Sequence, residues 1–247
     1  MTVREISSNS PYGQDYADIY DQSFDDRDDP GKLVAAISAV SPSGAILEFG
    51  IGSGRIALPL ARAGRHVTGV DNSKEMLALL EKKPGAEKIA NHLGDITTLK
   101  VAGEFSLVLV CFSTIYLLGS QSAQLLCFQN ASNHLRAGGR FLVEAFLHDR
   151  SQWLTNEQFS TTGVERDVVT ARAAVHDPVL QTITLQHLTI RAGGISFRPN
   201  LLRYIWPSEL DLMGKLSGMR LVERWGDWNR TSFSAASSNM ISVYEKI

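Results

Sequence analysis

Between residues 45 and 146 the chain alternates short apolar runs with longer stretches in which apolar residues recur every three or four positions. Short apolar runs are typical of buried strands, and the longer spacing is typical of helices that bury one face. Strands that alternate with helices of this length favour βαβ units in a parallel sheet. We therefore predict an α/β fold with strands over 45–49, 66–71, 90–94, 105–112 and 140–146 and helices over about 54–63, 73–83 and 122–135.

The pattern changes after residue 146. β-rich segments follow one another here, separated by the turn signals Asp177-Pro178 and Gly193-Gly194. This arrangement predicts an antiparallel insertion of three strands, over 167–176, 180–191 and 195–206. Beyond it we expect an amphipathic helix from Pro207 to Gly218 and two last strands, over 220–225 and 239–246.

Four aromatic residues near the N-terminus are spaced four apart, which places their rings on one face of a predicted helix: Tyr12, Tyr16, Tyr20 and Phe24. This stripe either packs into the core or faces a ligand. An Asp-rich loop and a second helix over 32–40 follow. We divide the chain into a helical cap (1–44), a core (45–150 and 205–247) and an insertion (151–204) that serves as a lid, a substrate-binding element or a dimer surface.

Composition narrows the classes of function. The formal net charge is −2 without clusters of Lys and Arg, so a nucleic acid is not an expected partner. No apolar run reaches membrane-spanning length, and the polar N-terminus does not resemble a secretory signal. Cys111 and Cys127 lie in apolar surroundings typical of free thiols, and the histidines lack the spacing of metal ligands. We expect a cytoplasmic protein without a metal.

A glycine-rich segment occupies the turn between the first strand and the first helix of the alternating region: Glu48-Phe49-Gly50-Ile51-Gly52-Ser53-Gly54. Glycines in such a turn let the backbone adopt positive φ and let a ligand approach closely. A dinucleotide-binding fingerprint has the spacing G-x-G-x-x-G. Here the third glycine comes one residue early, Arg55 holds its usual position, and Glu48 precedes the first glycine by two residues.

Two acidic residues end the next two strands. Asp71, followed by Asn72, comes roughly 20 residues after Gly50, the spacing at which the second strand reaches a ribose. A carboxylate there accepts hydrogen bonds from both ribose hydroxyls, and as a bare pattern it fits a nicotinamide nucleotide equally well. Asp95 ends the third strand, where a nicotinamide dehydrogenase requires no acid.

In this order and spacing, the segments resemble motif I, E/D-x-G-x-G-x-G, and the acidic positions of class I S-adenosylmethionine-dependent methyltransferases. The tyrosine-rich helix and the insertion after the fifth strand are similar in layout to bacterial small-molecule N-methyltransferases, which act on amino sugars and other natural-product amines. The resemblance implies a Rossmann-like seven-stranded sheet, with S-adenosyl-L-methionine as cofactor and S-adenosyl-L-homocysteine as product.

The resemblance also implies roles for individual residues. Asp95 is expected to accept a hydrogen bond from the adenine amino group while Ile96 covers the ring, and Met76 either contacts the other ring face or packs in the core. The segment that begins at Phe112 is expected to contact the methionine part through its backbone. Tyr20 matches a tyrosine that these enzymes place over the cofactor.

Methyl transfer from a sulfonium suggests further candidates near the reacting atoms. A sulfonium is attracted by aromatic faces and hydroxyl oxygens, which Tyr12, Tyr16 and Tyr20 supply from one helical face. We therefore take Tyr16 and Tyr20 as candidate catalytic residues and Tyr12 and Tyr16 as substrate contacts. Arg55 is a candidate partner for the cofactor carboxylate or for a local acid.

The remaining candidates depend on the methyl acceptor. An amine needs no dedicated base, whereas a hydroxyl does, and His148 stands at the right end of the sheet for that role. Tyr116 and Glu144 are candidate substrate contacts, Glu144 because a carboxylate suits a cationic amine.

We predict methylation of an amine nitrogen in a small natural-product intermediate, such as an antibiotic precursor. The alternatives are the terminal amine of a small peptide, a hydroxyl oxygen, or cofactor binding without methyl transfer, as in a cyclase or a partner subunit. A nicotinamide oxidoreductase is the remaining alternative, and a homodimer is an assembly that the insertion would allow.

Overall fold

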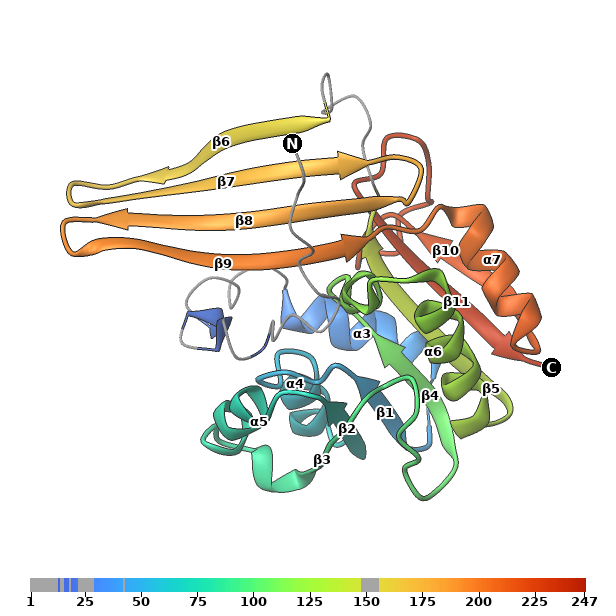
Figure 1. Cartoon of the computed structure of the whole chain (residues 1–247). Coiled ribbons are helices and arrows are strands. Elements are labelled where there is room, and N and C mark those ends of the chain that lie inside the picture. Colours follow the sequence, from blue (N-terminus) through green and yellow to red (C-terminus); the bar gives the residue numbers. More distant parts are fainter. Residues whose placement is uncertain (1–12, 14–15, 18, 22–28, 42, 148–155) are drawn as a thin grey trace.

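The computed structural model describes residues 13, 16–17, 19–21, 29–41, 43–147 and 156–247. Its core is a seven-stranded sheet in the order β10-β11-β5-β4-β1-β2-β3 (Figure 1). The pairs β3–β2, β2–β1, β1–β4 and β4–β5 are parallel, and β11 lies antiparallel between β5 and β10. The strands are β1 (Ile46–Phe49), β2 (Val67–Asp71), β3 (Ile89–Leu93), β4 (Phe105–Val110), β5 (Leu135–Phe146), β10 (Met219–Trp225) and β11 (Asn239–Lys246).

Helices cover both faces of this sheet. Residues of α3, α4 and α5 pack on one face together with Leu107 of β4, and residues of α6 and α7 pack on the other together with Val108. The helices are α3 (Pro30–Val40), α4 (Ala57–Arg62), α5 (Lys74–Glu81), α6 (Gln121–His134) and α7 (Pro207–Leu216), with short 3-10 turns η1 (Ala86–Lys88) and η2 (Thr114–Leu118). The predicted α/β class and seven-stranded sheet are confirmed.

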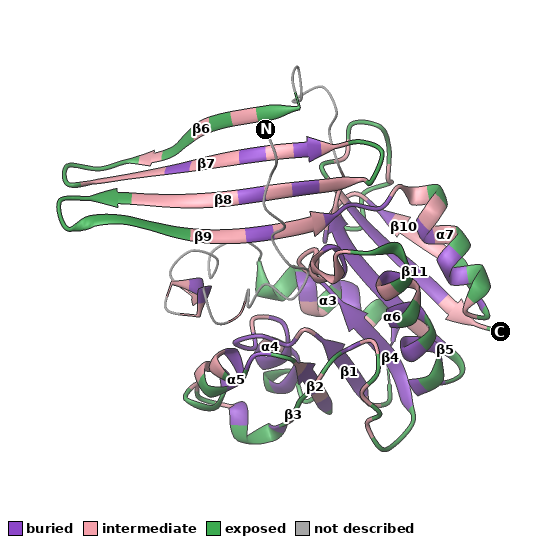
Figure 2. Ribbon diagram, in the orientation of Figure 1, coloured by how far each residue is buried: buried purple, intermediate pink, exposed green. Residues whose placement is uncertain are grey.

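The core lies where the sequence is most continuously apolar. Every residue of β1 and β4 is buried, as expected for central parallel strands that are covered on both faces. Figure 2 shows buried residues along β1, β4, β5 and β11, and exposed residues on helix surfaces, in loops, along β6 and at the far ends of β8 and β9. Because β1, β2, β3, β4 and β5 run parallel to one another, their carboxyl ends lie at one edge of the sheet.

Side-chain caps set where two of the helices begin. Ser73 accepts a hydrogen bond from the Met76 amide at the start of α5, and Ser120 accepts one from the Ala123 amide at the start of α6. Helix α4 begins at Ala57, three residues later than predicted, because the glycine turn continues through Gly54 with positive φ. The turn therefore stays open toward the carboxyl edge of the sheet.

The insertion is a separate antiparallel sheet in the order β6-β7-β8-β9, so it has four strands and not the predicted three. The strands are β6 (Glu157–Val164), β7 (Val168–Asp177), β8 (Thr182–Arg191) and β9 (Gly194–Arg203). The sequence reading missed β6 because its run is polar and is interrupted at Gly163, near a register shift in the β6–β7 pairing. Figure 1 shows the four strands as long hairpins that extend beyond the core from the η2 side.

Candidate cofactor and acceptor site

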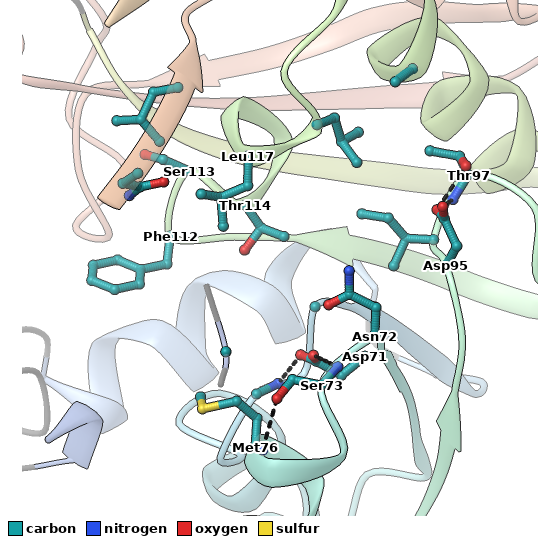
Figure 3. Close-up of a pocket in the computed structure, with 18 of the residues that line it drawn as sticks. Asp71, Asn72, Ser73, Met76, Asp95, Thr97, Phe112, Ser113, Thr114 and Leu117 are labelled. Carbon is teal, nitrogen blue, oxygen red and sulfur yellow. Dashed lines mark hydrogen bonds between the residues drawn. The ribbon is translucent and has the colours of Figure 1, made fainter. Parts of the chain in front are cut away.

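A cavity of about 930 Å³ lies at the carboxyl ends of β1, β2, β3 and β4 and extends to β9. This volume is at the upper end of the range for small-molecule sites. Figure 3 shows Asp71, Asn72 and Asp95 on one side of the cavity and Phe112, Ser113, Thr114 and Leu117 on another. The acids all lie at the end formed by β2, α5 and β3, which we call the cofactor end. The other end, lined by η2, Phe146 and β9, we call the acceptor end.

The glycine turn forms the floor of the cofactor end. Gly50 and Gly52 line the cavity, and both have positive φ. A Cβ on Gly50 would lie 2.5 Å from Thr114 Cγ2, so only glycine allows η2 to approach the turn this closely. Gly54 does not line the cavity, and a Cβ there would lie 2.4 Å from Leu80 Cδ1. Its role in this structure is to let the turn pack on α5.

Asp71 is held by two backbone amides. Its Oδ2 accepts a hydrogen bond from Gly52 N at 2.8 Å, and its Oδ1 accepts one from Ser73 N at 2.9 Å (Figure 3). Burial raises the pKa of Asp71, and the two amides oppose that rise. Each carboxylate oxygen retains a second lone pair, so the fixed carboxylate can accept two further hydrogen bonds from a ligand diol.

Asp95 is fixed in a comparable way at the end of β3. Its Oδ1 accepts hydrogen bonds from Thr97 N and Thr97 Oγ1, both at 2.7 Å. Buried Ile96 and Met76 line the same end of the cavity, and exposed Asn72 lies at its rim. Two fixed carboxylates, apolar side chains between them and a glycine floor fit a nucleoside with a ribose diol and an adenine amino group.

The N-terminal segment closes the cavity from outside the sheet. Tyr20 lines it, and its ring packs edge-on against Phe112 at 6.3 Å between centroids. Burial raises the pKa of Tyr20 to about 12, against the opposing effect of Arg55, so its hydroxyl stays protonated at neutral pH. Asp21, the next residue, accepts a hydrogen bond from Ser53 Oγ at 2.6 Å and so ties this segment to the glycine turn.

Tyr16 does not line the cavity. Its hydroxyl donates to the Arg198 carbonyl at 3.4 Å, and its ring packs edge-on against His187 of β8. Tyr16 therefore connects the N-terminal segment to the insertion, which the helical spacing alone did not indicate. Two further candidates on the substrate side, Tyr12 and His148, lie outside the described residues.

Glu48 and Arg55 lie behind the glycine turn and interact electrostatically. Glu48 is buried, and its Oε2 has no hydrogen-bond partner among the described residues. Burial raises the pKa of Glu48 to about 8, and Arg55 opposes this rise. The Arg55 guanidinium lies 4.7 Å from the centroid of the Phe112 ring. Neither side chain lines the cavity; Arg55 contacts the lining residue Phe112, and both Arg55 and Glu48 interact electrostatically with Tyr20.

Two predicted substrate contacts lie behind the cavity wall. Tyr116 is 0% exposed and donates its hydroxyl to the Phe146 carbonyl at 2.8 Å, because η2 turns this ring inward toward β5. Glu144 is also 0% exposed, and its Oε2 accepts a hydrogen bond from Phe112 N at 2.9 Å. The prediction that these side chains face the substrate is therefore wrong for this structure.

The role of Glu144 follows from the backbone above it. Phe112 and Ser113 both have positive φ, which is rare for residues other than glycine. Glu144 accepts from both of their amides, through its carboxylate for Phe112 and its carbonyl, at 3.0 Å, for Ser113. These contacts hold the strained turn that directs residues 112–114 into the cavity.

Apart from Ser113 and Thr114, which belong to the predicted segment after β4, the acceptor end consists of residues that were not predicted from the sequence. It is lined by apolar side chains from η2, β5 and β9, together with a few uncharged polar groups. The contact between β9 and η2 joins residues far apart in the chain, and no local pattern in the sequence indicates it. The lining residues are Ser113, Thr114, Leu117, Leu118, Ser120, Ala123, Phe146, Asn200, Leu201 and Leu202.

None of the described helices has the length and apolar character needed to cross a membrane. Within the described residues, no three His, Cys, Asp or Glu side chains come together in a way that could hold a metal ion.

Comparisons with known proteins show that this chain is similar to methyltransferases. A family model described as a methyltransferase domain matches residues 46–139. The CcbJ methyltransferase from Streptomyces caelestis is 34% identical and has a TM-score of 0.88, over 97% of this chain and 99% of that one. The cypemycin N-terminal methyltransferase from a Streptomyces species is 25% identical over 246 residues, 98% of this chain and 100% of the relative.

A third similar protein has been solved with S-adenosylmethionine bound. CalS10, an amino pentose methyltransferase from Micromonospora echinaspora whose structure holds S-adenosylmethionine, has a TM-score of 0.70 at 20% identity, over 93% of this chain and 97% of that one. Identity with CcbJ at this level over nearly the whole of both chains establishes the family. The chain belongs to the S-adenosylmethionine-dependent methyltransferases.

Proposed function

We propose that this methyltransferase acts on an amine nitrogen of a small natural-product intermediate. The main support is the acceptor end of the cavity, whose apolar wall includes Leu117, Leu118, Leu201 and Leu202. Apolar surroundings disfavour a charged ammonium and lower the pKa of a bound amine. The neutral amine has a free lone pair, so the wall itself favours the nucleophilic form and no dedicated base is required.

We assign the cofactor to the end with the two carboxylates. Asp71 would hold the ribose hydroxyls and Asp95 the adenine amino group, with Ile96 and Met76 against the ring and the glycine turn below. When bound, S-adenosylmethionine supplies a methyl group on a sulfonium, and its transfer to a neutral amine leaves S-adenosylhomocysteine and one proton for release. Tyr20 covers this end of the cavity with its ring and helps to exclude water.

The names of similar proteins support nitrogen as the acceptor atom. The cypemycin enzyme is an N-terminal methyltransferase, and CalS10 acts on an amino pentose. The amine of a small peptide is thus the second candidate, because its relative aligns along the whole chain. Both candidates present an amine to the same apolar wall.

A methyl-transfer panel tests the proposal. Formation of S-adenosylhomocysteine would be measured with an amino sugar, an alanyl dipeptide and catechol as acceptors. We expect turnover of at least one of the two amines, with the methyl group found on nitrogen by mass spectrometry. Turnover of catechol alone would overturn the proposal, and His148 would then be the first base to substitute.

We also propose that the insertion forms a homodimer through its outer face. The paired residues Val164, Val169, Ile190 and Ile195 form one apolar row across all four strands on this face. Phe159 and Phe197 lie on the same face and are 68% and 58% exposed. Contiguous exposed apolar surface of this kind is typical of protein interfaces.

A further inference from the structure

Asn200 of β9 is a polar residue in apolar surroundings at the acceptor end. It lines the cavity although only 7% of its surface is exposed. It pairs with Leu185 across the β8–β9 ladder, and Leu202 follows on the same face of β9. Its side-chain amide makes no hydrogen bond to any of the described residues.

A buried amide in such a position calls for a partner. Buried polar side chains are hydrogen-bonded in nearly all proteins, because water lost from the amide must be replaced. The polar atoms of the Asn200 side chain are not completely buried. Because Asn200 lines the cavity, the exposed part of its surface faces the cavity. The bound molecule is the partner that this geometry leaves for it.

The chemistry of the amide defines what that molecule presents. An asparagine side chain offers one carbonyl oxygen and one NH2 group, side by side. The oxygen can accept the N–H of a neutral amine and leave the nitrogen lone pair free. The NH2 group can donate to an oxygen on the neighbouring carbon of the same molecule.

We infer that Asn200 recognises a methyl acceptor in which the reacting amine adjoins a carbon bearing oxygen. This inference rests on the proposed action on an amine. A vicinal amino alcohol of a sugar and the amino-carbonyl end of a peptide both carry this arrangement. The remainder of the molecule lies against Leu117, Leu118, Phe146, Leu201 and Leu202, so the body of the acceptor is largely apolar.

The test compares acceptors that differ only in the neighbouring oxygen. One pair is trans-2-aminocyclohexanol and cyclohexylamine, and a second is alaninamide and isopropylamine. An amino sugar with a hydroxyl beside its amine serves as the sugar probe. We expect wild-type kcat/KM to be about tenfold higher for the oxygen-bearing member of at least one pair, as for one hydrogen bond in a desolvated site.

Asn200→Ala should reduce this preference to near unity, with the melting temperature and the Kd for S-adenosylhomocysteine unchanged. Gln186→Ala is the matched control, because Gln186 neighbours Leu185 on β8 but lies on the opposite face of the insertion. It should keep the wild-type preference. The pair that shows the preference distinguishes a sugar-like acceptor from a peptide.

The outcomes separate the two hypotheses. Amine turnover with a preference that survives in Asn200→Ala, or with no preference in the wild type, overturns the role of Asn200 and leaves the proposed function standing. Turnover of hydroxyl acceptors alone overturns the proposed function and, with it, the assignment of an N–H to the amide.

Discussion

At the scale of single residues, Asp71 connects the glycine turn to the proposed ribose contact. Replacement by Ala removes two charge-assisted hydrogen bonds to a ligand as well as the bonds to Gly52 N and Ser73 N. Hydrogen bonds to charged groups are worth about 1.5–3 kcal/mol each, so loss of both should raise the Kd for S-adenosylhomocysteine by about 100-fold or more by calorimetry. Asp167→Ala, in the exposed turn between β6 and β7, is the control. An unchanged Kd for Asp71→Ala would refute the ribose assignment.

Glu48 makes stability depend on pH in a direction unusual for a carboxylate. Folding raises its pKa from about 4.5 to about 8, so the folded state holds this proton more tightly than the unfolded chain does. The contribution of Glu48 to the free energy of unfolding is therefore most favourable below about pH 4.5. It declines as the pH rises toward 8 and stays constant above that.

Glu48→Gln removes this dependence and keeps the size of the side chain. We expect the free energy of unfolding of this variant, relative to wild type, to increase between pH 5 and pH 9 by up to about 1.4 kcal/mol for each unit of pKa shift. Urea unfolding at pH 5, 7 and 9 measures it, with exposed Glu104→Gln as control. A difference between variant and wild type that does not change with pH would contradict the assignment.

At the scale of elements, a polar network centred on buried Arg203 connects the insertion to the core. Arg203 at the end of β9 donates to Gln124 of α6 at 2.6 Å and to Glu209 of α7 at 2.7 Å. Hydrogen bonds from Gln181, Arg203 and Gln121 lower the pKa of Glu209, against the effect of its burial. This network determines how β9, and with it Asn200, lies against the acceptor end.

Removing one member of this network should loosen the insertion. Arg203→Met leaves Glu209 without its cation, and breaking a buried pair typically costs about 3–5 kcal/mol. We expect faster hydrogen exchange in β9 and weaker acceptor binding, with little change in β1 and β4. The double variant Arg203→Met/Glu209→Gln should recover part of the lost stability. Uniform destabilisation of the core strands would contradict a local role for the network.

The strands and the glycine turn could be predicted from the sequence because they depend on residues that are neighbours in the chain. Apolar runs located all seven core strands, and the spacing of Gly50, Asp71 and Asp95 indicated three strand ends that line one cavity. The features that were not predicted depend on contacts between residues far apart in the chain. The strand β9, which carries Asn200, meets η2 only through the fold, and the inward turn of Tyr116 depends on packing against β5.

At the scale of the whole molecule, the exposed outer face of the insertion predicts its state of assembly. Phe197→Lys places a charge on this face, and burying that charge in an interface is costly. We expect light scattering coupled to size exclusion to show a wild-type dimer and a monomeric variant that still binds S-adenosylhomocysteine. Val179→Lys changes an 87% exposed residue in the β7–β8 turn, at the opposite end of β8, and should remain dimeric. A monomeric wild type at micromolar concentration would contradict the proposed dimer, and dissociation of both variants would show that the interface is not confined to this face.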